Sequence, residues 1–208
     1  MTALTDQQRE TIQAQIEATE ARTSAEFVTV IAQSAESYLF IPTLVAAVAT
    51  FLHSGVFLLF QSALPLTMIE FYAGQVVVFA ILALICRIPE IRFALVPKSI
   101  RHQRASRLAR QMFLDLGLTE TEDRNAALLF AAMGERYVEI IADVGLQQRL
   151  EDPEVWDGIV ERFVEDVRAG EVGEGFAYAV EGCADVMAAH FPNREDAPNR
   201  FLDKLIEI

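Results

Sequence analysis

The feature that most constrains this chain is a long stretch without charged side chains. Residues 39–69 contain no Asp, Glu, Lys or Arg, and residues 71–86, which follow Glu70, contain none either. Each run is close to the roughly 20 residues that a helix needs to cross the apolar core of a bilayer. Buried helices of a soluble domain, the alternative, rarely stay free of charge for so long. We therefore expect a transmembrane hairpin within residues 39–87, with spans at about 40–60 and 66–86.

The charges outside these runs are strongly segregated. The whole chain has a net charge of −13, yet residues 87–110 carry seven basic residues and one acid, a net charge of +6. The connection between the two runs has no Lys or Arg. Because basic residues stay on the cytoplasmic side of a membrane, we expect this segment and both chain termini to be cytoplasmic, with the hairpin in a bacterial inner membrane.

Residues 88–116 are interpreted as a basic juxtamembrane segment that lies on anionic lipid. A topology signal without a further role is the alternative. A nucleic-acid partner is not expected, because no aromatic residue interleaves with the charges of residues 98–110 and the rest of the chain outside the hairpin is acidic. The residues expected to face lipid are Arg101, Arg104, Arg107 and Arg110.

Helix and strand patterns flank the apolar runs on both sides. Thr5 and Gln8 have the spacing of a capping box, which predicts a helix to about Arg22. Residues 26–32 are rich in β-branched and aromatic side chains and predict a strand. Two further strands, a hairpin turn and two helices are predicted after the basic segment, at residues 126–132, 136–143, 133–135, 152–170 and 172–191.

The parts before and after the hairpin are expected to form one domain. A strand at residues 26–32 would be unstable alone, and its partners occur only after the hairpin. The fold class is therefore α/β, a helix and sheet domain interrupted by a transmembrane helical hairpin. The two parts of this domain are residues 1–38 and 117–192, and residues 193–208 form a C-terminal tail.

Several segments resemble the TPM domain family. They include the capped helix after Leu4 with the strand at 23–30, the segments 124–130 and 137–145, Trp156, and the helical residues 168–176. Bacterial membrane proteins in which a two-span insertion splits a TPM domain are the most similar subgroup. Many members of the family have Gly where this chain has Ala126, and a turn richer in glycine than Asp143-Val144-Gly145.

The strand ends suggest a candidate metal site. Glu26, Asn125 and Asp143 could meet at one edge of the sheet, and such oxygen ligands suit Ca²⁺ or Mg²⁺. The resemblance permits this reading, since some TPM members are described as phosphatases or as calcium-binding. The alternative is that the carboxylates cap turns or pair with Arg124 or Arg136.

No motif for nucleophilic or zinc catalysis is present, and the three histidines are scattered. We expect an inner-membrane protein whose cytoplasmic TPM-like domain binds a protein partner or assists in assembling or maintaining a membrane complex. A metal-assisted phosphatase is the alternative. A small oligomeric transporter, suggested by Glu70 and His53 in the apolar region, is a more distant one, and self-association is left open.

Overall fold

The computed structural model describes residues 5–60, 66–150, 152, 154–193 and 205–208. The chain divides into two compact units. One comprises residues 1–35 and 102–208, and the other comprises residues 36–101. The first is a helix and sheet domain and the second is helical, so the expected α/β fold class is confirmed.

The described strands form one sheet of four, in the order β3-β2-β1-β4. They are β1 (Phe27–Ala32), β2 (Ala127–Ala132), β3 (Tyr137–Ala142) and β4 (Leu205–Glu207). The helices of this unit are α1 (Asp6–Glu20), α5 (Lys98–Asp115, from His102 onward), the short 3-10 helix η1 (Leu118–Glu120), α6 (Val144–Arg149), α7 (Val155–Ala169) and α8 (Val172–His190).

The centre of the sheet is the parallel pair of β1 and β2. Phe27 lies opposite Ala127 and Ala32 lies opposite Ala132, so the two strands match along their whole length. A parallel pair needs a crossover connection, and here the crossover contains everything between residues 33 and 126. The apolar helices are therefore inserted into the crossover of a β-α-β unit, upstream of its helix α5.

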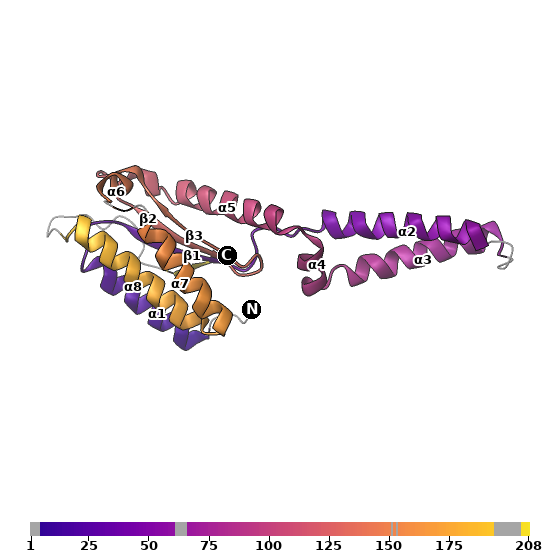
Figure 1. Ribbon diagram of the computed structural model, residues 1–208, viewed down its shortest axis with the longest axis horizontal. Helices are drawn as coiled ribbons and strands as arrows, with labels where there is room; N and C mark the ends of the chain where they lie inside the picture. The colour runs from indigo at the N-terminus through magenta and orange to yellow at the C-terminus, as the bar shows by residue number, and fades with distance from the viewer. Residues whose placement is uncertain (1–4, 61–65, 151, 153, 194–204) are drawn as a thin grey trace. The chain divides into compact units, whose positions relative to one another are not determined.

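Helices cover both faces of the sheet (Figure 1). Side chains alternate between the two faces along β1. Phe27 and Ile31 pack with α1, α7 and α8 on one face, and Val28 and Val30 pack with α5 on the other. All six residues of β1 and of β2 are buried, which explains why both strands read as continuous apolar runs.

Most of the predicted elements of this unit are confirmed. The capping box of Thr5 and Gln8 is present, and α8 and the antiparallel β2–β3 hairpin lie where expected. Helix α7, expected from residue 152, starts later, and its N-cap is Glu154. The helix begins at Val155, while the Asp152 carboxylate accepts a hydrogen bond from the Glu154 N–H (2.9 Å). Pro153 lies outside the described residues.

The elements η1, α6 and β4 were not predicted, and neither was the packing of α5 on the sheet. Residues 88–116 were assigned to a juxtamembrane segment apart from the domain. In the structure the small side chains Ala105 and Ala109, with Phe113, are buried against β1 and β2. The C-terminal part of α5 is therefore a structural layer of the α/β unit.

The second unit contains α2 (Phe40–Phe60), α3 (Met68–Ile85) and α4 (Pro89–Leu95). Only Pro42 and Ala46 are buried in α2, and no residue is buried in α3. The two helices contact each other through stacked rings of Phe57 and Phe71 and a hydrogen bond from Gln75 Nε2 to Ser54 Oγ. Both helices are long and apolar enough to span a membrane.

Glu70 has a local structural role at the start of α3. Its carboxylate accepts hydrogen bonds from the Thr67 N–H and hydroxyl, both at 2.8 Å, and the Thr67 hydroxyl accepts one from the Glu70 N–H. This second capping box explains a carboxylate at the edge of an apolar run. The N-cap of α3 is Thr67.

A buried carboxylate holds the chain where it leaves β1. Glu135, in the β2–β3 turn, is only 1% exposed, and its Oε1 accepts hydrogen bonds from Ser34 Oγ and the Ala35 N–H, both at 3.0 Å. Its other oxygen, Oε2, has no hydrogen-bond partner among the described residues.

Glu135→Ala should destabilise the α/β unit by about 1–3 kcal/mol, because it leaves two partly buried donors without an acceptor. Glu135→Gln keeps an acceptor oxygen for these donors, so we expect a smaller loss. Urea unfolding of the detergent-solubilised chain measures both. The exposed Glu165 on α7 supplies the control, Glu165→Ala, and equal effects of the Ala and Gln variants at position 135 would contradict this assignment.

Tyr137 provides a pH-dependent probe of the face covered by α5. Burial raises its pKa to about 12, and its hydroxyl donates to the Glu139 carboxylate (2.8 Å). The folded state thus favours the neutral phenol, and this contribution to stability is complete below the usual pKa of 10 and is lost as pH rises to about 12. Alkaline titration of tyrosinate absorbance should lose its step near pH 12 in Tyr137→Phe. The exposed Tyr178→Phe should keep that step.

Candidate functional site

The expected edge of the sheet is formed where β1 and β2 begin and β3 ends. Phe27, Ala127 and Ala142 lie side by side across β1, β2 and β3. The next residues toward this edge are Glu26 and Ala126, which precede β1 and β2, and Asp143, which follows β3. Two backbone hydrogen bonds continue the ladder there, from the Ala127 N–H to the Glu26 carbonyl and from the Asp143 N–H to the Ala126 carbonyl, each 2.8 Å. Glu26 and Asp143 are thus brought to the same edge but on strands separated by β2.

Asp143 is engaged by Arg124. Arg124 Nε lies 2.6 Å from Asp143 Oδ2 and Arg124 Nη2 lies 2.8 Å from Asp143 Oδ1. The Val144 N–H also donates to Oδ1 (2.7 Å), so Asp143 is the N-cap of α6. Hydrogen bonding to this carboxylate raises the pKa of the Arg124 guanidinium. Both oxygens of Asp143 therefore accept from protein donors, as in the alternative that the sequence left open.

The backbone around Arg124 is unusually constrained. Arg124 has φ of 51°, in the left-handed region, where a residue with a side chain is uncommon. Its carbonyl accepts from the Gly145 N–H (2.9 Å). A Cβ added to Gly145 would lie 2.1 Å from the Asp123 carbonyl oxygen and 2.7 Å from that of Arg124. Gly145, the glycine that this chain keeps in the turn after β3, is therefore required by close backbone packing.

Asn125 is buried beside this pair and links β1 to β2. Its Nδ2 donates to the Ser24 carbonyl (3.0 Å), and its N–H donates to the Thr121 hydroxyl (3.1 Å). The Ser24 hydroxyl is a buried atom without a hydrogen-bond partner among the described residues. The amide thus connects loops far apart in the sequence, and it holds the start of both central strands in register.

This arrangement does not fit a divalent metal ion as it stands. The guanidinium of Arg124 occupies both oxygens that Asp143 would offer a cation. Within the described part of the chain, no three His, Cys, Asp or Glu side chains gather as potential ligands. Ca²⁺ or Mg²⁺ binding by Glu26, Asn125 and Asp143 therefore stays a prediction, and so does the phosphatase activity that depends on it.

The basic residues of α5 differ in exposure. Arg107 and Arg110 are exposed, whereas Arg101 and Arg104 are half-buried. The exposed pair leaves charged groups available to anionic headgroups, but the helix also presents Ala105 and Ala109 to the sheet. Lipid contact by these arginines stays a prediction.

Both cysteines are free and buried. Burial raises the pKa of the Cys183 thiol in α8 well above its usual value, which keeps it protonated and unreactive.

Asp143→Ala should lower the free energy of unfolding by about 1–3 kcal/mol, because the Val144 N–H and the Arg124 side chain lose the buried carboxylate that accepts their hydrogen bonds. In an Arg124→Ala background the same change should cost less, since the two side chains act as a pair. Chemical unfolding of the four chains gives this double-mutant cycle. The exposed pair of Arg22 and Glu181 is the control cycle and should show weaker coupling. Additive effects of the Arg124 and Asp143 substitutions would contradict the pairing.

Comparisons with known proteins support the fold of the α/β unit. Residues 89–186 match the family model of the TPM domain. No curated protein matches the chain. Among solved structures, the chain is similar to the NMR structure of the BA42 protein from the psychrophilic bacterium Bizionia argentinensis. The TM-score is 0.61 at 14% identity, covering 100% of this chain and 97% of the other, so the likeness shows the fold alone.

The family match has definite limits along the chain. It runs from α4 through most of α8 and includes Arg124, Asn125, Asp143 and Gly145. It does not include α1, β1 or the apolar helices α2 and α3. The resemblance to the TPM domain is thus confirmed for residues 89–186.

Proposed function

We propose that this chain is a bacterial inner-membrane protein whose α/β unit faces the cytoplasm and docks a partner protein within a membrane complex. The observation that carries the proposal is the exposure of α2 and α3. A core helix of a soluble protein would be mostly buried, yet these apolar helices bury two residues and none. Apolar surface of this extent needs a cover, and a bilayer is the cover that matches two helices of such length.

The pairing of β1 with β2 supports a hairpin that enters and leaves the membrane on one side. β1 precedes α2, β2 follows α5, and the two strands are neighbours in one sheet. Strands on opposite sides of a membrane cannot pair, so an even number of spans must separate them. Two spans satisfy this requirement.

The charge distribution supports a cytoplasmic position for the α/β unit. The basic residues of 87–110 follow α3 directly, whereas residues 61–69 contain no Lys or Arg. The positive-inside rule counts the basic residues within about 15–20 residues of a span. The strand pairing then keeps residues 27–32 on the same side as this basic segment.

A docking role agrees best with the chemistry of the described residues. Asp143 is neutralised by Arg124, and the described carboxylates do not gather in the pattern of a metal-dependent hydrolase. A membrane-anchored domain with a helix-covered sheet can instead present an edge to another protein, as many peptide-binding domains do.

Topology reporters test the membrane arrangement. A reporter inserted within residues 61–65 should be active only outside the cytoplasm, and one fused after Ile208 should be active only inside. Replacing the four basic residues nearest to the span with Gln should weaken this orientation, because it removes the signal that holds the loop inside. The four positions are Arg87, Arg92, Lys98 and Arg101.

The control replaces four arginines that lie further along the chain, and it should leave both reporter signals unchanged. Its positions are Arg107, Arg110, Arg162 and Arg168. Equal signals from the two insertion sites in the unmodified chain would contradict the two-span arrangement and, with it, the membrane anchoring of this domain.

A further inference from the structure

The edge of β1 that faces away from β2 is occupied by a short tail strand. β4 runs parallel to β1, with Leu205 opposite Thr29 and Glu207 opposite Ile31. Two backbone hydrogen bonds extend the ladder, from the Ile208 N–H to the Ile31 carbonyl (3.0 Å) and from the Gln33 N–H to the Ile208 carbonyl (2.8 Å). The described tail pairs with three of the six residues of β1.

The tail strand places apolar side chains on both faces of the sheet. Leu205 packs against the core shared with α1, α7 and α8, and Ile206 packs against the core shared with α5. Both side chains are half-buried rather than fully enclosed. The edge therefore accepts alternating apolar side chains from an extended segment, with modest burial for each.

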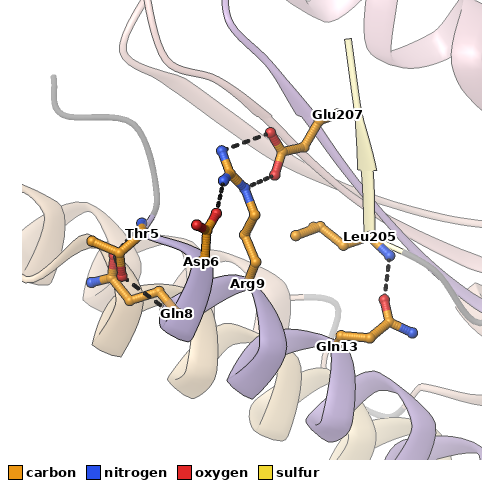
Figure 2. A network of polar contacts seen from close by, with 7 residues as sticks. All are labelled: Thr5, Asp6, Gln8, Arg9, Gln13, Leu205 and Glu207. Carbon is orange, nitrogen blue, oxygen red and sulfur yellow. Dashed lines mark hydrogen bonds and ion pairs between the residues drawn. The ribbon is translucent and has the colours of Figure 1, made fainter.

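Helix α1 contacts the polar groups of the same strand, as Figure 2 shows. Arg9 Nε lies 2.5 Å from Glu207 Oε1 and Arg9 Nη2 lies 3.3 Å from Oε2, while Arg9 Nη1 lies 2.7 Å from Asp6 Oδ1. Gln13 Oε1 accepts from the Leu205 N–H (3.0 Å). Hydrogen bonding to Glu207 raises the pKa of Arg9. Exposed ion pairs of this kind add little stability. They therefore contribute more to selecting which segment binds the edge than to holding that segment tightly.

The connection to the tail is longer than its position requires. Helix α8 ends beside the start of β1, where the Ser24 N–H donates to the Phe191 carbonyl and Pro192 pairs with Thr23. Thr23 and Thr29 are six residues apart, at most about 20 Å along a strand. Residues 193–204 can extend to about 40 Å. The tail is therefore held by its own contacts and not by a short connection.

We propose that the edge of β1, with Arg9 and Gln13 of α1, is a binding site for an extended segment of a partner protein, and that residues 205–208 occupy it when the partner is absent. The partner segment would run parallel to β1 with the pattern apolar, apolar, acidic, apolar. This is strand addition to a sheet edge, in which backbone bonds supply affinity and side chains supply selectivity. The inference rests on the proposed docking role and names its surface.

The contacts favour a foreign segment over the tail of a second copy. A tethered tail competes at an effective concentration of about millimolar, and an identical tail from another copy makes no additional contact to overcome it. A foreign segment displaces the tail only if it makes more contacts with the edge than the tail does.

The test uses the full chain in detergent and a fluorescent hexapeptide with the sequence of residues 203–208. A chain lacking residues 205–208 should bind this peptide at least about tenfold more tightly than the unmodified chain, because the tethered competitor is gone. Arg9→Glu in the shortened chain should weaken binding, and a peptide carrying Glu207→Lys should restore it. The matched control is Arg22→Glu, since Arg22 forms ion pairs with Glu181 and Asp185 of α8 and not with the tail strand.

Equal peptide binding by the shortened and unmodified chains, or equal effects of Arg9→Glu and Arg22→Glu, would overturn the proposal. Dimers of the unmodified chain that cross-link only when residues 205–208 are present would also overturn it, because the occupant would then be a second copy.

Hydrogen exchange provides a measurement that does not depend on a shortened chain. Glu207→Lys in the full chain should speed exchange of the Leu205 and Ile208 amides, and adding Arg9→Glu should slow it again. Unchanged exchange in Glu207→Lys would overturn the role of Arg9. Peptide binding in detergent is independent of membrane orientation. A negative peptide result with the expected reporter signals would therefore remove this docking edge and leave membrane anchoring intact.

Discussion

The pairing of β1 with β2 is the interaction on which the rest of the molecule depends. These strands are far apart in the sequence, yet they match residue for residue and every side chain in both is buried. The loop that they close contains the whole apolar hairpin, so their association carries a large entropic cost. Burial of both faces by helices is what offsets this cost. The buried Asn125 and Glu135 lie near the two ends of the pair and connect it to the incoming and outgoing chain.

The same pairing explains the segregation of charge. A sheet whose strands lie on both sides of the insertion requires the apolar helices to leave and return as a unit, which a hairpin does. In the proposed membrane arrangement, the basic residues immediately after α3 orient the chain, and the acidic residues that follow keep the domain soluble. The net charge of −13 is the sum of these opposed regions and describes neither of them.

The sequence was most informative where one physical signal dominates. The spacing of Thr5 and Gln8 predicted the start of α1, and continuous apolar runs predicted β1 and β2. Helix α5 was missed as a core layer because its buried face consists largely of alanines, which contribute little to an apolar pattern among many arginines. β4 was missed because three residues are too few for a periodic pattern to emerge.

The candidate metal site shows a different limit. The sequence correctly indicated that Glu26 and Asp143 lie at one edge, since strand ends determine the row to which a residue belongs. It left open the partner of Asp143, because pairing with Arg124 depends on a left-handed backbone at Arg124 and on the close approach of Gly145. Neither property has a periodic signature. The decisive information is backbone geometry in a loop, which only the folded structure supplies.

The tail strand has a consequence for the stability of the sheet as well as for recognition. An uncovered β1 edge would present unpaired backbone groups beside buried apolar residues, an arrangement that promotes edge-to-edge aggregation. The edge is covered by a short strand whose side chains are half-buried and whose ion pair is exposed, so the strand is held only weakly. Because the cover is weak and tethered, an isolated domain stays protected while a longer segment with the right pattern can still replace it. Protection of the edge and access to it thus arise from the same few contacts of Arg9, Gln13 and residues 205–208.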